Sequence, residues 1–106
     1  MATFDDRKKG FEEKFAHDEE LEFKAVARRN KLLGLWAAER LGLGGEAAAA
    51  YARDVVESDF REAGHEDVFA KVWEDFQAKS VSLSEHQLRS QMKDLLEEAR
   101  RQMAQG

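Results

Sequence analysis

Apolar residues recur every three or four positions along most of the chain, which is the period of an amphipathic α-helix. Nothing alternates with period two over a useful length, so the pattern predicts no sheet. It predicts four helices, at about residues 18–41, 46–63, 66–79 and 84–104. The links between them are short, which is typical of helices that fold back on one another. We therefore expect an all-α fold, with residues 18–106 forming a compact four-helix bundle.

The third helix has the sharpest apolar stripe, formed by Phe69, Val72, Trp73 and Phe76. We expect this stripe to form the centre of the core. The residues expected to pack against it are Leu32, Leu35 or Trp36, Val55 and Met92.

Helix ends also have recognisable signals. Gly42 is placed to terminate the first helix, because glycine readily adopts the left-handed conformation that follows a helix. At the start of the fourth helix, Ser84 with Gln87, or Ser82 with Glu85, would form a capping box.

The first seventeen residues differ from the rest of the chain, because they are densely charged and poor in apolar residues. We expect a flexible N-terminal arm over residues 1–17, since so little burial does not offset the entropy cost of ordering. Yet Phe4, Phe11 and Phe15 would fall within about 60° of one another on a helix. One interpretation is a segment that becomes a helix in the groove of a partner. The other is that the phenylalanines cover the core of the bundle itself.

Composition narrows the class of protein. The chain has 106 residues, no cysteine and a net charge of −5. A single domain fits this length. The negative charge argues against binding to nucleic acid, and no apolar run approaches the roughly 20 residues of a membrane span. We therefore expect a cytoplasmic protein that does not insert into a membrane.

Signals of catalysis are weak. Glu62 and His65 have the spacing of a bundle metal ligand pair, but a di-metal site needs a second copy, so we expect no metal. The glycines of residues 42–45 lack the lysine and hydroxyl of a phosphate-binding loop. The basic residues around Arg28 and Arg29 suit an acidic partner or an ordinary ion-paired surface. Two classes remain: an interaction protein that delivers its arm to a partner, and a small enzyme or metal carrier.

Six stretches of the chain are distinctive. They read TFDDR at residues 3–7, FEEKFAHDEEL at 11–21, ARRNKLLGLWAAERLGL at 27–43, AYARDVVESDFREAG at 50–64, EDVFAKV at 66–72 and SEHQLRSQM at 84–92. In this order they resemble the zeta-type ATPase inhibitor subunit of alphaproteobacterial F-type ATP synthases. The resemblance extends from residue 3 to about residue 99, which is nearly the whole chain.

The resemblance implies a four-helix protein that is not an enzyme and needs no cofactor. Members of this family bind the catalytic head of the ATP synthase and block ATP hydrolysis. The resemblance further implies that the arm inserts as a helix at a catalytic interface between the alpha and beta subunits, near the gamma stalk, and blocks rotation. We accordingly expect a monomer when free, which associates with the membrane-bound ATP synthase on its cytoplasmic side.

Under this interpretation the three phenylalanines face the partner, and the charges around them set register. The residues expected to contact the partner are Thr3, Phe4, Asp5, Asp6, Arg7, Lys8, Phe11, Lys14 and Phe15. Arg28 and Arg29 are secondary candidates. The alternative is a helical-bundle interaction or small-ligand-binding protein with its arm packed as core.

Overall fold

The structure is a computed structural model that describes residues 19–59 and 66–105. Its elements are the helices α2 (Glu19–Arg40), α3 (Gly45–Ser58), α4 (Glu66–Ala78) and α5 (Glu85–Gln105). No strand occurs within these residues, so the all-α prediction is confirmed. Apart from the end of α3, the bounds differ from the expected ones by one residue at most. The expected arm and the expected end of the second helix lie outside the described residues.

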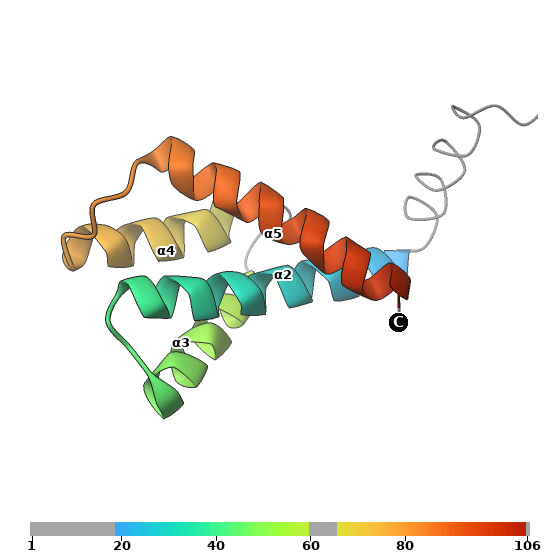
Figure 1. The fold of residues 1–106 in the computed structure, drawn as a ribbon, viewed down its shortest axis with the longest axis horizontal. Helices are drawn as coiled ribbons and strands as arrows, with labels where there is room; N and C mark the ends of the chain where they lie inside the picture. The colour runs from blue at the N-terminus through green and yellow to red at the C-terminus, as the bar shows by residue number, and fades with distance from the viewer. Residues whose placement is uncertain (1–18, 60–65, 106) are drawn as a thin grey trace, which may run out of the picture.

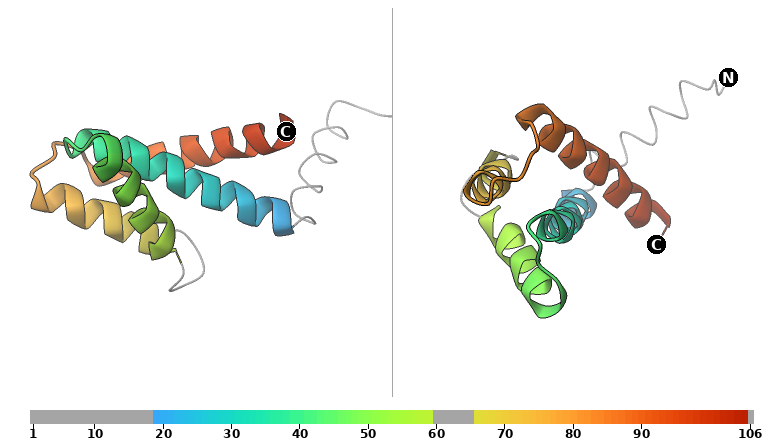
Figure 2. Two further views of the ribbon diagram at one scale, coloured as in Figure 1. Left: turned by 90° about the horizontal axis from the view of Figure 1, so that it is seen from below. Right: turned by 60° about the vertical axis from the view of Figure 1, so that its left-hand side comes forward.

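The four helices pack in a ring, in the order α2, α3, α4, α5 and back to α2 (Figures 1 and 2). Helices α2 and α4 also touch across the ring, whereas α3 and α5 make no contact within the described residues. The contacts of α2 with α3 and with α5 are the most extensive. Helix α2 is therefore in contact with all three of the other helices.

A glycine allows α2 and α3 to approach closely. A Cβ atom added at Gly34 would lie 2.6 Å from the Cα atom of Ala52, which is closer than such atoms can come. Ala37 and Ala38, one turn further along α2, are completely buried. The small side chains in this part of α2 thus bring the two backbones together.

The core confirms most of the expected residues. Phe69, Val72 and Phe76 are buried together with Val55 and Met92. Trp73 is only half-buried and stacks on Phe69 with 5.9 Å between ring centroids, so it lies at the edge of the core. The expectation that Trp73 lies at the centre is therefore wrong.

The expected register of α2 was also wrong in part. Leu33 is completely buried, while Leu32 is only half-buried and Leu35 is 40% exposed. Trp36 is half-buried and lies 5.8 Å from Phe76 between ring centroids. Because other helices surround α2 on several sides, its apolar residues cover a wide arc. The pattern alone could not tell which of them faces the centre.

Both of the expected helix signals are confirmed. Gly42 has a φ of +79°, and the N–H of Leu43 donates to the carbonyl of Ala38 at 2.8 Å, as in a Schellman motif. The N–H of Gln87 donates to Ser84 Oγ at 3.0 Å, and the N–H of Ser84 donates to Gln87 Oε1 at 2.9 Å. These two bonds between Ser84 and Gln87 form the capping box, with Ser84 rather than Ser82 as the cap.

Candidate partner-binding surface

The candidate residues of the arm, Thr3 to Phe15, lie outside the described residues, and so do Glu62 and His65. Arg28 and Arg29 are the sequence candidates that the structure describes. Both lie near the middle of α2.

The two arginines lie in different environments. Arg28 is exposed, and its guanidinium donates to Gln102 Oε1 of α5 at 2.8 Å. Arg29 is only 1% exposed, and its Nε donates to Asn30 Oδ1 at 2.6 Å. Burial lowers the pKa of Arg29, and the nearby carboxylate of Asp59 partly opposes that shift. The two side chains therefore do not form one basic face, because consecutive residues of a helix point about 100° apart.

The buried arginine belongs to a polar link between α2 and the end of α3. Asn30, also 1% exposed, accepts the bond from Arg29 and donates from Nδ2 to Asp59 Oδ2 at 3.1 Å. Paired in this way, polar groups can be buried at little cost. Arg29 is thus bound inside the bundle, and Arg28 alone of the two is available at the surface.

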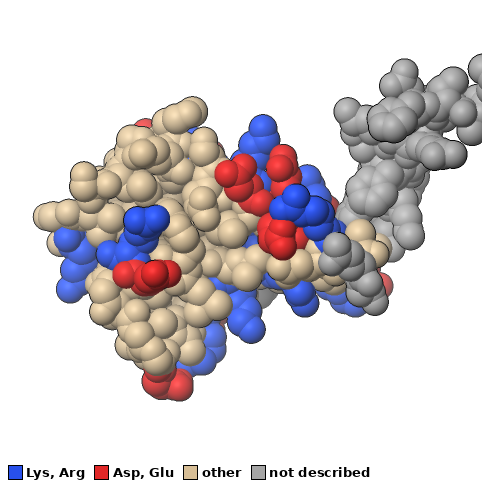
Figure 3. All heavy atoms as spheres, in the orientation of Figure 1, with Lys and Arg blue, Asp and Glu red and all other residues tan. Residues whose placement is uncertain are grey.

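An ion pair joins the first half of α2 to the last part of α5. Arg100 donates to both carboxylate oxygens of Glu22, at 3.2 and 2.5 Å. The pKa of Arg100 is raised, chiefly by this hydrogen bond. Glu98 and Arg101 pair within α5. Figure 3 shows acidic and basic side chains gathered together near this end of the molecule.

Phe23 lies in the same part of α2 and is 69% exposed. The ion pair between Glu20 and Lys24, with 3.2 Å between Oε1 and Nζ, is on the adjoining turn. Sequence reasoning did not include Phe23 among the candidates, because α2 was assigned its apolar face without it. The signal available in the sequence was that Phe23 follows the three phenylalanines of the arm. We call Phe23, Glu20, Lys24 and Arg28 the α2 entry surface.

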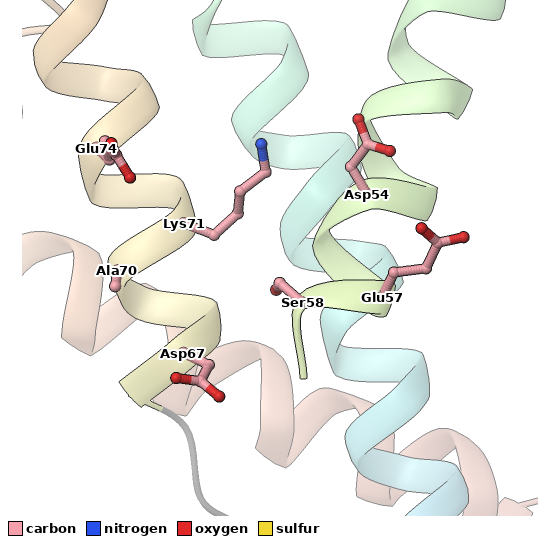
Figure 4. Close-up of a pocket in the computed structure, with 7 residues that line it drawn as sticks. All are labelled: Asp54, Glu57, Ser58, Asp67, Ala70, Lys71 and Glu74. Carbon is pink, nitrogen blue, oxygen red and sulfur yellow. The ribbon is translucent and has the colours of Figure 1, made fainter. Parts of the chain in front are cut away.

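A second feature is an open depression between α3 and α4 of about 510 Å³. Its lining residues are Asp54, Glu57, Ser58, Asp67, Ala70, Lys71 and Glu74. Figure 4 shows Lys71 extending from α4 toward α3, where Asp54 lies. Lys71 Nζ pairs with Asp75 Oδ2 at 2.9 Å, so the one cation of this lining is already engaged. The depression is acidic and would repel a phosphate or another anion.

The part of the chain that the structure describes holds no group of three or more acidic, histidine or cysteine side chains placed to bind a metal ion. Among the same residues, no helix is long and apolar enough to cross a membrane.

The described residues define an all-α bundle with one exposed aromatic side chain, Phe23, beside the ion pair of Glu20 and Lys24. Residues 1–102 match the family described as ATPase inhibitor subunit zeta, and the chain belongs to that family. The family resemblance noted in the sequence is confirmed.

A comparison with solved structures agrees with this assignment. A protein whose structure was determined by solution NMR is 48% identical to this chain, with a TM-score of 0.71. The match covers 80% of this chain and 96% of the other protein. A search of curated proteins finds no match.

Proposed function

We propose that this protein inhibits ATP hydrolysis by the F-type ATP synthase by inserting residues 1–17 as a helix at an interface between its alpha and beta subunits. There the helix would reach toward the gamma stalk and block rotation. The observation that carries the proposal is the match to an ATPase inhibitor subunit family over residues 1–102, because that match includes both the arm and the bundle.

The proposal assigns binding to the arm and folding to the bundle. Every buried hydrophobic residue of the described chain lies at Ala25 or later, and the main core cluster begins at Leu33. In this proposal the arm binds the partner, and the described core holds the bundle together. The bundle would then hold the arm at high local concentration beside the enzyme.

The phenylalanines of the arm would supply most of its affinity. Burying Phe4, Phe11 or Phe15 in the partner would each contribute roughly 1.5–3 kcal/mol. The entropy cost of ordering the arm opposes this gain, so the loss of any one anchor should weaken binding. The neighbouring charges, among them Asp5 and Arg7, would set register and orientation.

The partner in this proposal is the catalytic head of the ATP synthase, with its alpha, beta and gamma subunits. The encounter takes place on the cytoplasmic side of the membrane, and the free protein is a monomer. The inhibitor acts by occupying a site and performs no chemistry of its own.

Deletion of residues 1–16 tests the proposal. We expect the shortened protein to melt at the temperature of the parent, because the deletion removes no residue of the described core. We expect it to lose inhibition of ATP hydrolysis by its cognate ATP synthase. Phe11→Ala and Phe15→Ala should each weaken inhibition without lowering the melting temperature, since side chains that are exposed before binding do not stabilise the fold.

Lys9→Ala is the matched control within the arm, because Lys9 is charged like its neighbours but is not among the expected contacts. Full inhibition by the shortened protein would contradict the proposal and would place the inhibitory contact on the bundle, with Arg28 as the next candidate. A large drop in melting temperature would instead favour an arm that is packed as core.

A further inference from the structure

We propose that the contact with the ATP synthase continues past the arm onto the α2 entry surface, and that Phe23 is a further anchor that enters an apolar pocket beside the site where the arm inserts. This inference rests on the proposed function. It adds a contact outside the arm, on a part of the chain that is folded before the partner is met.

The exposure of Phe23 is unusual within this chain. Among the described aromatic residues, Tyr51, Phe69 and Phe76 are buried, and the two tryptophans are half-buried. Phe23 is 69% exposed. A single exposed apolar side chain is common on protein surfaces and needs no explanation by itself. What distinguishes Phe23 is its position close to the proposed binding site of the arm.

Chain length keeps Phe23 close to the proposed binding site. Glu19, where the described chain begins, is four residues beyond Phe15 in the sequence. Fully extended, these four residues span at most about 14 Å. From Glu19 to Phe23 the helix rises about 6 Å. Whatever path the chain takes, Phe23 lies within about 20 Å of the point that holds Phe15, which is close enough to reach the partner's surface around that point.

The surroundings of Phe23 match the anatomy of an interface. The pair of Glu20 and Lys24 has exposed side chains, at 78% and 55%. An aromatic centre with a charged and solvated rim is the usual arrangement of an energetic centre of binding. The partner surface that fits it is an apolar pocket with polar groups at its edge.

The fold also holds this surface in place before binding. Glu22, the residue before Phe23, receives two hydrogen bonds from Arg100 of α5. Arg28, one turn beyond Phe23, donates to Gln102. These bonds fix the rotation of α2 about its own axis, and with it the direction of Phe23. A side chain that is already oriented loses less entropy on binding than one on a segment that is ordered only as it binds.

Titration of ATP hydrolysis with the full chain carrying Phe23→Ala tests the inference. We expect the concentration for half-maximal inhibition to rise by about tenfold, which is a typical loss for an aromatic anchor. Inhibition at saturation should stay complete, since the arm is intact. Phe23→Leu should recover most of the affinity, because it keeps an apolar side chain. The melting temperature of both variants should equal that of the parent.

Leu35→Ala is the matched control. Leu35 is the other large hydrophobic residue that is exposed among the described residues of the chain. It lies twelve residues beyond Phe23 on α2, about 18 Å along the helix, and borders a groove between α2 and α3. We expect Leu35→Ala to leave the concentration for half-maximal inhibition unchanged.

If Phe23→Ala leaves the concentration for half-maximal inhibition unchanged, the inference is overturned. It is also overturned if Leu35→Ala weakens inhibition as much as Phe23→Ala does, because the contact would then lie along α2 and α3. A lower melting temperature of Phe23→Ala would make Phe23 part of the fold and would also overturn it. The proposed function is tested separately by the deletion of residues 1–16. If that deletion abolishes inhibition while Phe23→Ala has no effect, the inference fails and the proposed function stands.

Discussion

The two halves of α2 are held in the bundle by different forces. In the second half, Leu33 and Ala37 are completely buried, and Gly34 brings the backbone against Ala52. In the first half, polar contacts to α5 are prominent: the ion pair of Glu22 with Arg100 and the hydrogen bond from Arg28 to Gln102. One continuous helix therefore combines an apolar end with a polar end.

The difference has an energetic consequence. Burial of apolar side chains contributes about 1.5–3 kcal/mol each for residues of the size of leucine. A surface ion pair contributes about 0–1 kcal/mol. Stability therefore resides mainly in the second half of α2 and the helices packed there. The first half can carry exposed groups such as Phe23 and change its contacts without unfolding the bundle.

The largest effect is expected in the apolar region. Phe76→Ala should lower the free energy of unfolding by about 3–5 kcal/mol, because it removes a completely buried ring and leaves a cavity. Denaturation by urea measures this change in the free energy of unfolding. Phe23→Ala, which removes the same ring from the polar end, should change the stability by less than about 0.5 kcal/mol. Similar losses of stability in the two variants would contradict the difference between the two halves of α2.

An intermediate effect is expected where the two regions meet, at Arg29. Arg29→Ala should cost about 2–3 kcal/mol, because a charged hydrogen bond is lost and buried Asn30 Oδ1 is left without its donor. The neighbouring change, Arg28→Ala, should cost less than about 0.5 kcal/mol, since its guanidinium is exposed.

The same pair of variants sharpens the functional assignment. If Arg28 contacts the partner, Arg28→Ala weakens inhibition at an unchanged melting temperature. Arg29→Met keeps the apolar part of the side chain and separates lost packing from lost hydrogen bonding. A parent-like stability of both Arg29 variants would show that the polar link between α2 and α3 contributes nothing.

An effect confined to alkaline pH is expected in the apolar region. Burial, followed by the hydrogen bond that Tyr51 donates to Asp75 at 2.8 Å, raises the pKa of Tyr51 above its ordinary value of 10.0. The folded state keeps this proton when the unfolded state has lost it. The stabilisation is therefore complete below pH 10 and is lost as the pH rises further.

Melting temperatures of the parent and of Tyr51→Phe, measured from neutral pH to above pH 10, test this effect. The variant should be slightly less stable near neutral pH and should lose less stability above pH 10. Tyr51 is the only tyrosine of the chain, so the ultraviolet absorbance of tyrosinate reports on it alone. Tyrosinate that forms at the ordinary pKa without unfolding would contradict the prediction.

Acidic pH is expected to affect stability at the polar end of the bundle, through Glu98 of α5. The hydrogen bond from Gln102, followed by that from Arg101, lowers the pKa of Glu98. A lowered pKa stabilises the folded state above the unfolded pKa, and this contribution is lost as the pH falls through the folded value. Glu98 is solvated, so its effect on stability is small.

Much of the fold was predictable because its signals are local. The capping box of Ser84 and Gln87 depends on residues three apart, and Gly42 ends α2 through bonds within five residues. The period of apolar residues likewise depends only on neighbouring turns of helix. Such features need no knowledge of where the other helices lie.

The sequence by itself determined the class of the protein, its helices and its family, since helical period, caps and the distinctive strings are all properties of consecutive residues. Only the tertiary structure decided that Leu33 rather than Leu32 enters the core. It also decided that Arg29 is buried while Arg28 and Phe23 remain exposed. The physical reason is that burial depends on which helices surround a residue, and α2 has neighbours on several sides. On such a helix, adjacent residues of similar chemistry receive different surroundings, and no local pattern distinguishes them.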